Sequence, residues 1–219
     1  MPLIDAAPYP FEFRPETLAL LAIDMQRDYV LPGGYGASLG LDVAPCQAIV
    51  PAVVSLVDLF RARGLPVIHT RQTHKPDLSD CPPAKLRRGN PKLRIGDPGP
   101  MGRLLIRGEH GSDFIDELQP LPGEAVVDKP GKGAFYATDL HDMLGRLGAE
   151  QLVVCGVTTE VCVQSTIREA NDRGYDCLLV EDCTASYYPA FRQATIEMIR
   201  SSNALIGWTA PLAAVAAAL

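Results

Sequence analysis

Several kinds of protein are disfavoured by what this sequence does not contain. Aromatic residues account for 6% of the 219 residues, and no run of Lys and Arg with interleaved aromatics is present, so we expect no nucleic-acid partner. The first residues are Pro and acidic side chains instead of a basic segment followed by an apolar run, which favours a cytoplasmic protein. The uncharged C-terminal stretch is Ala-rich and interrupted by Gly207 and Pro211, whereas a membrane span needs about 20 strongly apolar residues. We therefore expect no membrane association.

Motifs for metals and nucleotides are also missing. The six cysteines include no CxxC pair, and without an export signal we expect them to be reduced thiols. Two glycine-rich stretches, residues 32–36 and 130–133, lack the GxGxxG spacing of a dinucleotide site. His69 and His74 are not part of a DWHP-like string, and the two other histidines are isolated. The sequence thus predicts no metal and no cofactor.

What remains fits a single α/β domain. Apolar residues make up 47% and charged residues 21%, with a formal net charge of −6, and a chain of 219 residues suits one domain over residues 1–219. Short apolar runs alternate with helical patterns, which is typical of a parallel sheet with helices on both faces. We predict a three-layer α/β/α fold with a doubly wound sheet of six mainly parallel strands. The expected strands are residues 18–23, 66–70, 125–128, 151–155, 177–180 and 204–207.

Four amphipathic stretches between these strands are the expected helices. Three of them end at Gly64, Gly148 and Gly174, where glycine permits the turn that stops a helix. The expected helices are residues 45–63, 139–147, 161–173 and 189–202.

The stretch 72–123 interrupts this alternation. It is rich in Pro, Gly and charged residues, and it is too long for a simple connection. We expect an arm over the carboxyl edge of the sheet, where open α/β folds bind their ligands. Its most basic part, residues 85–94, favours a solvated loop or a subunit contact over a phosphate or RNA site.

Three residues whose side chains could take part in catalysis follow predicted strands. Asp24 follows the first strand, Lys129 follows the third, and Cys162 starts the helix after the fourth. Singly, each fits an ordinary structural role: a helix cap, a surface charge and a small buried side chain. Because the carboxyl ends of parallel strands meet at one edge, a carboxylate, an ammonium group and a thiol are expected to converge.

The three groups suit nucleophilic catalysis. A thiol must ionise to attack, and its ordinary pKa is about 8.5. We expect the helix N-terminus and Lys129 to favour the thiolate of Cys162, and Asp24 to accept its proton and return it to a departing amine. Backbone N–H groups between Thr158 and Cys162 are placed to bind the oxyanion of a tetrahedral intermediate.

Three strings carry a resemblance to a known family. DMQRDY follows the first predicted strand, DKPGKGAF includes Lys129, and GVTTEVCV leads into STIREANDRGY. Together they resemble the isochorismatase-like cysteine hydrolases from about residue 18 to residue 208. The resemblance implies the isochorismatase-like (Rossmann-like) fold and a metal-independent hydrolase of C–N bonds whose catalytic trio is Asp24, Lys129 and Cys162. Members of this family commonly form dimers or tetramers, which implies a homo-oligomer.

The resemblance also implies details of the site. A cis peptide bond is expected between Val157 and Thr158, with the amides of Thr158 and Cys162 as the oxyanion hole. The strings HTRQTHKPDL, IGDPGPMGRLLIRGEHG and VVDKPGKGAFYATDL are similar to the biuret hydrolase branch, with triuret hydrolase and ureidoacrylate amidohydrolase nearby. Where a biuret hydrolase is expected to carry Gln near the pocket, this chain has Ser202 and Asn203. The departure leaves the choice among linear ureides open.

Four further residues are candidates for substrate binding. Lys132 in the PGKG loop is placed to bind the distal carbonyl oxygens of a ureide, although a solvated loop lysine is the alternative. Tyr29, Tyr35 and Phe135 are expected to form an aromatic wall against a planar small-molecule substrate.

Other functions fit less of the sequence. N-carbamoyl amidohydrolase activity is chemically close to ureide hydrolysis and is an alternative. Nicotinamidase activity would need metal ligands that this sequence does not show. Isochorismatase proper is often fused to a carrier domain, which is not seen in this sequence. A catalytically inactive oligomeric scaffold is the alternative outside enzymes, and the presence of all three catalytic residue types argues against it.

Overall fold

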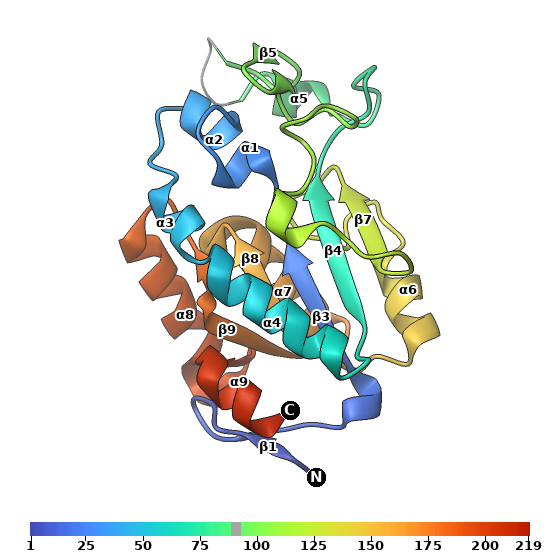
Figure 1. Cartoon of the computed structure of the whole chain (residues 1–219), viewed down its shortest axis with the longest axis vertical. Helices are drawn as coiled ribbons and strands as arrows, with labels where there is room; N and C mark the ends of the chain where they lie inside the picture. Colours follow the sequence, from blue (N-terminus) through green and yellow to red (C-terminus); the bar gives the residue numbers. More distant parts are fainter. Residues whose placement is uncertain (89–92) are drawn as a thin grey trace.

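A sheet of six parallel strands forms the centre of the computed structural model, which describes residues 1–88 and 93–219 (Figure 1). The strands lie in the order β10-β9-β8-β3-β4-β7. They are β3 (Leu18–Ile23), β4 (Val67–Gln72), β7 (Ala125–Lys129), β8 (Gln151–Val157), β9 (Asp176–Ala185) and β10 (Trp208–Ala210). From β3 the chain runs outward to β7 and then returns to β8 on the other side of β3. Such a reversal opens a crevice at the carboxyl ends of β3 and β8.

Helices cover both faces of the sheet. Every residue of β3 is buried, and successive side chains point to opposite faces, so Leu20 belongs to one apolar cluster and Leu21 to the other. The first cluster lies under α3 (Ala44–Ala48), α4 (Val50–Ala62) and α9 (Leu212–Ala218). The second lies under α6 (Leu140–Leu147), α7 (Gln164–Asp172) and α8 (Pro189–Ala204). The predicted three-layer α/β/α fold is confirmed.

Close approach of backbones fixes the middle of the sheet. A Cβ atom on Gly156 in β8 would lie 2.0 Å from the carbonyl oxygen of Ile23 in β3, and its φ is +109°. Glycine is therefore required where the two strands flank the crevice. At the C-terminal end of α6, Gly148 has φ of +66° and stops the helix as expected.

The last expected strand was placed wrongly. Residues 201–204 continue α8 in irregular form, with Ser202 and Asn203 at positive φ, and Leu205 is 71% exposed. The strand begins at Trp208, which pairs with Leu178 of β9. A four-residue apolar run cannot be distinguished from the end of a helix by its pattern, which explains the error.

The expected helix over residues 45–63 is divided into α3 and α4. By length and composition alone, Ala44–Ala62 is long and apolar enough to cross a membrane. Its side chains Val53, Leu56 and Phe60 are fully buried in the first apolar cluster. This packing accounts for the apolar composition of the helix.

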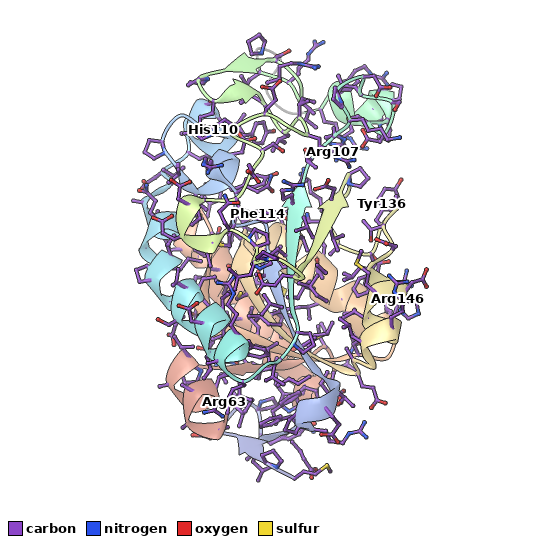
Figure 2. All side chains as sticks on the ribbon, turned by 45° about the vertical axis from the view of Figure 1, so that its right-hand side comes forward. Arg63, Arg107, His110, Phe114, Tyr136 and Arg146 are labelled. Atoms are coloured by element: carbon purple, nitrogen blue, oxygen red, sulfur yellow. The ribbon has the colours of Figure 1, made fainter. Side chains whose placement is uncertain are left out.

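The arm predicted at residues 72–123 lies beyond the carboxyl ends of β3 and β4 (Figure 1). It contains short elements: α5 (Pro83–Leu86), β5 (Pro98–Gly99), β6 (Gly102–Arg103) and η2 (Asp116–Leu118). The buried Phe114 of the arm (Figure 2) packs edge-on against His69 of β4. Residues 89–92, part of the basic stretch, lie outside the described residues.

The arm is tied to two helical turns that follow β3, namely α1 (Arg27–Val30) and α2 (Tyr35–Ser38). The Asp28 carboxylate accepts hydrogen bonds from the backbone N–H of Leu105 at 3.0 Å and of Tyr35 at 3.1 Å. Burial raises the pKa of Asp28, and these two hydrogen bonds oppose that shift. At the other end of the molecule lie the remaining short elements, β1 (Leu3–Ile4), β2 (Phe11–Glu12) and η1 (Pro15–Thr17).

Candidate active site

Asp24 sits at the crevice where the chain leaves β3. Its φ is +51°, a left-handed conformation that Asp tolerates better than most residues and that turns the chain sharply after the strand. One carboxylate oxygen, Oδ1, accepts a hydrogen bond from Thr70 Oγ1 at 2.6 Å, and Thr70 belongs to the neighbouring strand β4. The side chain is completely buried. Its position is therefore fixed by two adjacent strands.

Lys129 reaches Asp24 from the edge strand β7. Its Nζ lies 2.7 Å from Asp24 Oδ2, and both side chains have no exposed surface. The same ammonium group donates to the carbonyl oxygens of Gly131 at 3.2 Å and Lys132 at 2.9 Å. Burial tends to lower the pKa of Lys129, but the charges of Asp24 and Cys162 outweigh it and raise the pKa. Lys129 is thus held as a cation.

Cys162 lies in a π-helical turn, η3 (Thr159–Val163), between β8 and α7. Its Sγ lies 3.4 Å from Oε1 of Gln72, the last residue of β4. Burial raises the pKa of the thiol to about 11; Lys129 lowers it and Asp24 raises it further. Lys129 acts in the direction expected from the sequence, toward the thiolate, but the loss of hydration has the larger effect and leaves the pKa raised.

A small cavity of about 200 Å³ opens beside the thiol. Four expected site residues line it together with Cys162: Tyr29, Tyr35, Lys132 and Thr158. The other lining residues were not expected from the sequence, and they are Leu41, Gln72, Glu160, Val161, Tyr187 and Tyr188. The cavity is called the inner cavity below.

The two tyrosines and Lys132 are placed by specific contacts. The rings of Tyr29 and Tyr35 meet edge to face with centroids 6.3 Å apart, as an aromatic wall requires. Lys132 Nζ lies 3.3 Å from Gln72 Oε1, the same oxygen that faces the thiol. Gln72 therefore connects the nucleophile to the expected substrate-binding lysine. Nothing in the sequence signals this role, because the expected strand ends at residue 70 and Gln72 falls at the start of the expected arm.

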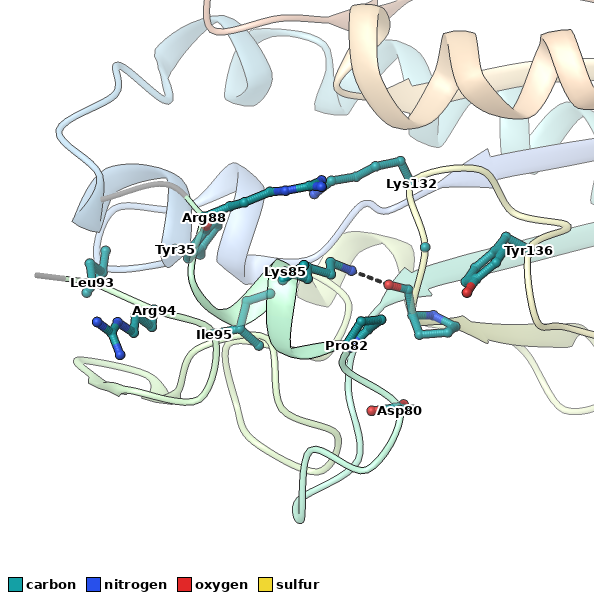
Figure 3. Close-up of a pocket in the computed structure, with 13 residues that line it drawn as sticks. Tyr35, Asp80, Pro82, Lys85, Arg88, Leu93, Arg94, Ile95, Lys132 and Tyr136 are labelled. Carbon is teal, nitrogen blue, oxygen red and sulfur yellow. Dashed lines mark hydrogen bonds between the residues drawn. The ribbon is translucent and has the colours of Figure 1, made fainter. Parts of the chain in front are cut away.

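A larger outer cavity of about 460 Å³ does not contain the thiol but shares Tyr35 and Lys132 with the inner cavity (Figure 3). The arm supplies most of its wall, and the exposed Tyr136 also lines it (Figure 3). Its charged side chains are mainly basic. The charged side chains are Asp80, Lys85, Arg88, Arg94 and Lys132.

Lys85 is the most constrained of these cations. It donates to the carbonyl oxygen of Pro130 and lies 3.1 Å from Nε2 of His74 (Figure 3). Burial lowers the pKa of Lys85 to about 8, and the nearby charge of Lys132 lowers it further. Asp80 is engaged with His74 at 3.3 Å and with the N–H of Lys75 at 3.1 Å. Two close cations with the nearest carboxylate engaged elsewhere create a positive potential at the junction of the cavities.

The histidines have partners of their own. His74 lies between Asp80 and Lys85, and burial lowers its pKa. His69 pairs with Glu124 at 3.0 Å, and burial lowers its pKa as well. Within residues 1–88 and 93–219, no group of three or more His, Cys, Asp or Glu side chains is arranged to hold a metal ion.

The sequence and the fold match known proteins. The sequence model of the isochorismatase domain matches residues 18–210. This chain belongs to the isochorismatase family. Ureidoacrylate amidohydrolase RutB of Azorhizobium caulinodans is 30% identical over 215 residues, 96% of this chain and 94% of that protein. An isochorismatase family protein of Desulfovibrio vulgaris is 29% identical, with a TM-score of 0.75 over 91% of this chain and 96% of that one. A cysteine hydrolase of Pseudomonas syringae pv. phaseolicola, 24% identical, shares the fold with a TM-score of 0.80 over 99% and 96% of the two chains.

Three residues of this isochorismatase-family chain lie elsewhere than expected or outside the site. Phe135 is 4% exposed and stacks on Tyr175, with ring centroids 5.9 Å apart, so its assignment to the substrate wall is wrong. The apolar cluster beneath α6 and α7 takes up this ring instead. Ser202 and Asn203 are exposed at the end of α8 and line neither cavity.

The peptide bond between Val157 and Thr158 is cis. Thr158 directly follows β8, and both Thr158 and Cys162 line the inner cavity. We propose that the backbone amides of these two residues bind the oxyanion.

Proposed function

We propose that this chain is a cysteine amidohydrolase that cleaves the terminal C–N bond of a small linear ureide and releases ammonia. The observation that carries the proposal is the junction of Cys162, the Asp24–Lys129 ion pair and a cavity wide enough for a small planar molecule. The ureidoacrylate amidohydrolase named among the relatives supports the same reaction class.

In the proposed mechanism Asp24 accepts the thiol proton of Cys162, and the sulfur attacks the terminal carbonyl carbon. Because the thiol pKa is about 11, the attack needs this proton transfer. The amides of Thr158 and Cys162 bind the oxyanion, and protonated Asp24 then gives its proton to the departing ammonia. Water activated by Asp24 hydrolyses the thioester and restores the thiol, releasing a carbamate-type acid. Lys129 keeps Asp24 oriented throughout.

The two cavities bear on which ureide is bound. The inner cavity, at about 200 Å³, is smaller than the roughly 300–1,000 Å³ of common ligand pockets, which suits a compact neutral ureide such as biuret or triuret. A substrate that also enters the basic outer cavity would carry a distal carboxylate, as ureidoacrylate and N-carbamoyl amino acids do. We favour the carboxylated ureide, because Lys85 and Lys132 lie close enough together for their charges to interact.

A substrate panel tests the function. Ammonia release is measured with biuret, triuret, 3-ureidoacrylate, 3-ureidopropionate and nicotinamide, with the Cys162→Ala protein as the blank. We expect the carboxylated ureides to have the highest kcat/KM and the neutral ureides to be slower. Hydrolysis of nicotinamide with no ureide touched would overturn the ureide assignment.

A further inference from the structure

Three residues that line the inner cavity each carry a buried polar atom without a hydrogen-bond partner in the described residues. These atoms are Tyr29 Oη, Gln72 Nε2 and Glu160 Oε2. Buried polar atoms in folded proteins are almost always paired, and each exception calls for an explanation. Their convergence on one cavity indicates a polar ligand with both hydrogen-bond donors and acceptors.

Glu160 is the distinctive member of this set. It is the one carboxylate among the residues that line the inner cavity, and it lies two positions before Cys162 in the same π-helical turn. None of the ion pairs found within residues 1–88 and 93–219 involves it. Its charge contributes to raising the pKa of Cys46 and of Tyr187, after burial in both cases, so the carboxylate faces groups that do not neutralise it.

The other two unpaired atoms are hydrogen-bond donors, whereas the carboxylate is an acceptor. Tyr29 Oη donates readily, and Gln72 Nε2 is a donor whose partner oxygen Oε1 already faces Cys162 and Lys132. The backbone of Gln72 is held by the side chain of Gln26, which accepts from its N–H at 2.8 Å and donates to its carbonyl at 3.2 Å. The backbone of Gln72 is therefore fixed at the end of β4, while Tyr29 belongs to α1.

A ureide and a plain amide differ in the group that these atoms would recognise. A ureide has an N–H on each side of its carbonyl carbon, whereas a primary amide has N–H groups on one side and carbon on the other. A carboxylate accepts hydrogen bonds and donates none. Because Glu160 lines the same cavity as the nucleophile, its carboxylate suits the N–H that remains on the acyl side.

We infer that Glu160 is a substrate-binding residue that accepts a hydrogen bond from the N–H on the acyl side of the scissile carbonyl and so selects ureides over plain amides. Tyr29 Oη and Gln72 Nε2 donate to the distal oxygens of the same substrate. The inference rests on the proposed function and adds the feature by which the ureide is recognised.

Matched substrates test the role of Glu160. Malonamide is biuret with its central N–H replaced by CH₂, and glutaramate is 3-ureidopropionate with the same replacement. Glu160→Gln keeps the size of the side chain but removes its charge and presents an amide in its place. We expect kcat/KM for the ureide of each pair to fall about tenfold or more, mainly through KM, and kcat/KM for the CH₂ analogue to change less than about threefold.

Glu197→Gln is the matched control, because it makes the same change on the exposed face of α8 and should leave every substrate unaffected. Equal losses on the ureide and its CH₂ analogue would overturn the inference and leave the ureide hydrolase standing. A wild-type protein that hydrolyses neither ureide would instead remove the proposed function itself.

A binding measurement covers the case in which Glu160→Gln fails to fold. Calorimetry with the Cys162→Ala protein, which has an intact Glu160, should give biuret and 3-ureidopropionate a lower Kd than their CH₂ analogues by about tenfold. Equal affinities within each pair would overturn the inference.

Discussion

Burial and charge act in opposite directions on the nucleophile. Burial raises the pKa of Cys162 more than the ammonium group of Lys129 lowers it, and the resulting pKa is about 11. The thiol is protonated at neutral pH, so reactivity depends on a base within reach. Asp24 is that base in our mechanism, which gives each member of the trio a separate task.

Replacement of Cys162 tests the nucleophile. Cys162→Ala should abolish turnover, because no other side chain in the inner cavity is placed beside Asp24 and Lys129. Cys162→Ser should be inactive as well, since a hydroxyl ionises far less readily than a thiol. Ammonia release and far-UV circular dichroism are the measurements. More than trace activity in a folded Cys162→Ala protein would remove Cys162 from the mechanism.

The pH dependence of KM tests the outer cavity. With its pKa near 8, Lys85 carries a charge at pH 7 and loses most of it by pH 9. The ratio of KM for 3-ureidopropionate to KM for biuret should therefore rise about threefold to tenfold over this range, the size expected for one partly solvated charge interaction. The ratio removes effects of the thiol, which both substrates share.

Two variants serve as controls for this titration. Lys85→Arg keeps its charge over the whole range, so the ratio should stay flat and low. Lys85→Met has no charge, so the ratio should stay flat and high. A wild-type ratio that does not change between pH 7 and 9 would contradict a role for Lys85 in binding the carboxylate.

At the residue level, the sequence identified the site residues that directly follow strands. Asp24 and Lys129 follow apolar runs, and parallel strands bring such ends together. Gln72 and Glu160 were missed, because a polar residue that faces a cavity has the same sequence pattern as one that faces solvent. Phe135 was assigned to the wall on its aromatic character, whereas the direction of a loop side chain depends on packing that no local pattern reveals.

The helices hold the site by packing on the sheet, and α4 offers the clearest test. The side chain of Phe60 in α4 is completely buried against the sheet. Phe60→Ala should therefore lower the free energy of unfolding by about 3–5 kcal/mol through lost burial and the cavity left behind. Asp58→Ala, on the exposed side of the same helix, should change it by less than about 0.5 kcal/mol. Urea unfolding measures both, and equal effects would show that the packing of α4 is not as described.

Elements differed in how far the sequence predicted them. The bounds of β3 match the expected strand, because six consecutive apolar residues lie between polar neighbours. The strands expected at residues 66–70 and 125–128 are present as β4 and β7 but extend further, since their polar ends Gln72 and Lys129 still pair in register. The two-residue strands β5 and β6 have no periodicity to recognise.

For the molecule as a whole, charge is distributed unevenly. The chain has a net charge of −6, yet the outer cavity gathers four cationic side chains and one carboxylate. An anionic substrate would be repelled by the protein at long range and attracted at the mouth of the site.

Assembly is the property of the whole chain that we expect from the family resemblance. Two large apolar side chains of α8 are exposed, Phe191 at 53% and Met198 at 43%. Exposed apolar groups on one helix suit a subunit contact. We expect a homo-oligomer, a dimer or a tetramer, in light scattering at micromolar concentration. A single monomer peak would contradict this.

Metal independence is a further expectation for the whole enzyme. Activity should survive exhaustive EDTA treatment and should not increase when Zn²⁺, Fe²⁺ or Mn²⁺ is added, because the mechanism assigns each step to a side chain or a backbone amide. Stoichiometric metal in the purified protein, lost together with activity, would contradict it.

The strand order has a consequence for the folding of the enzyme. Asp24, Lys129 and Cys162 reach one crevice from β3, β7 and the turn after β8, with β4 inserted between the first two strands. No continuous segment shorter than the stretch from Asp24 to Cys162 contains all three. Contacts so distant along the chain form late, because long loops must close before they can pair. During synthesis the nascent protein therefore has no partial activity, and catalysis begins only after both halves of the sheet have joined.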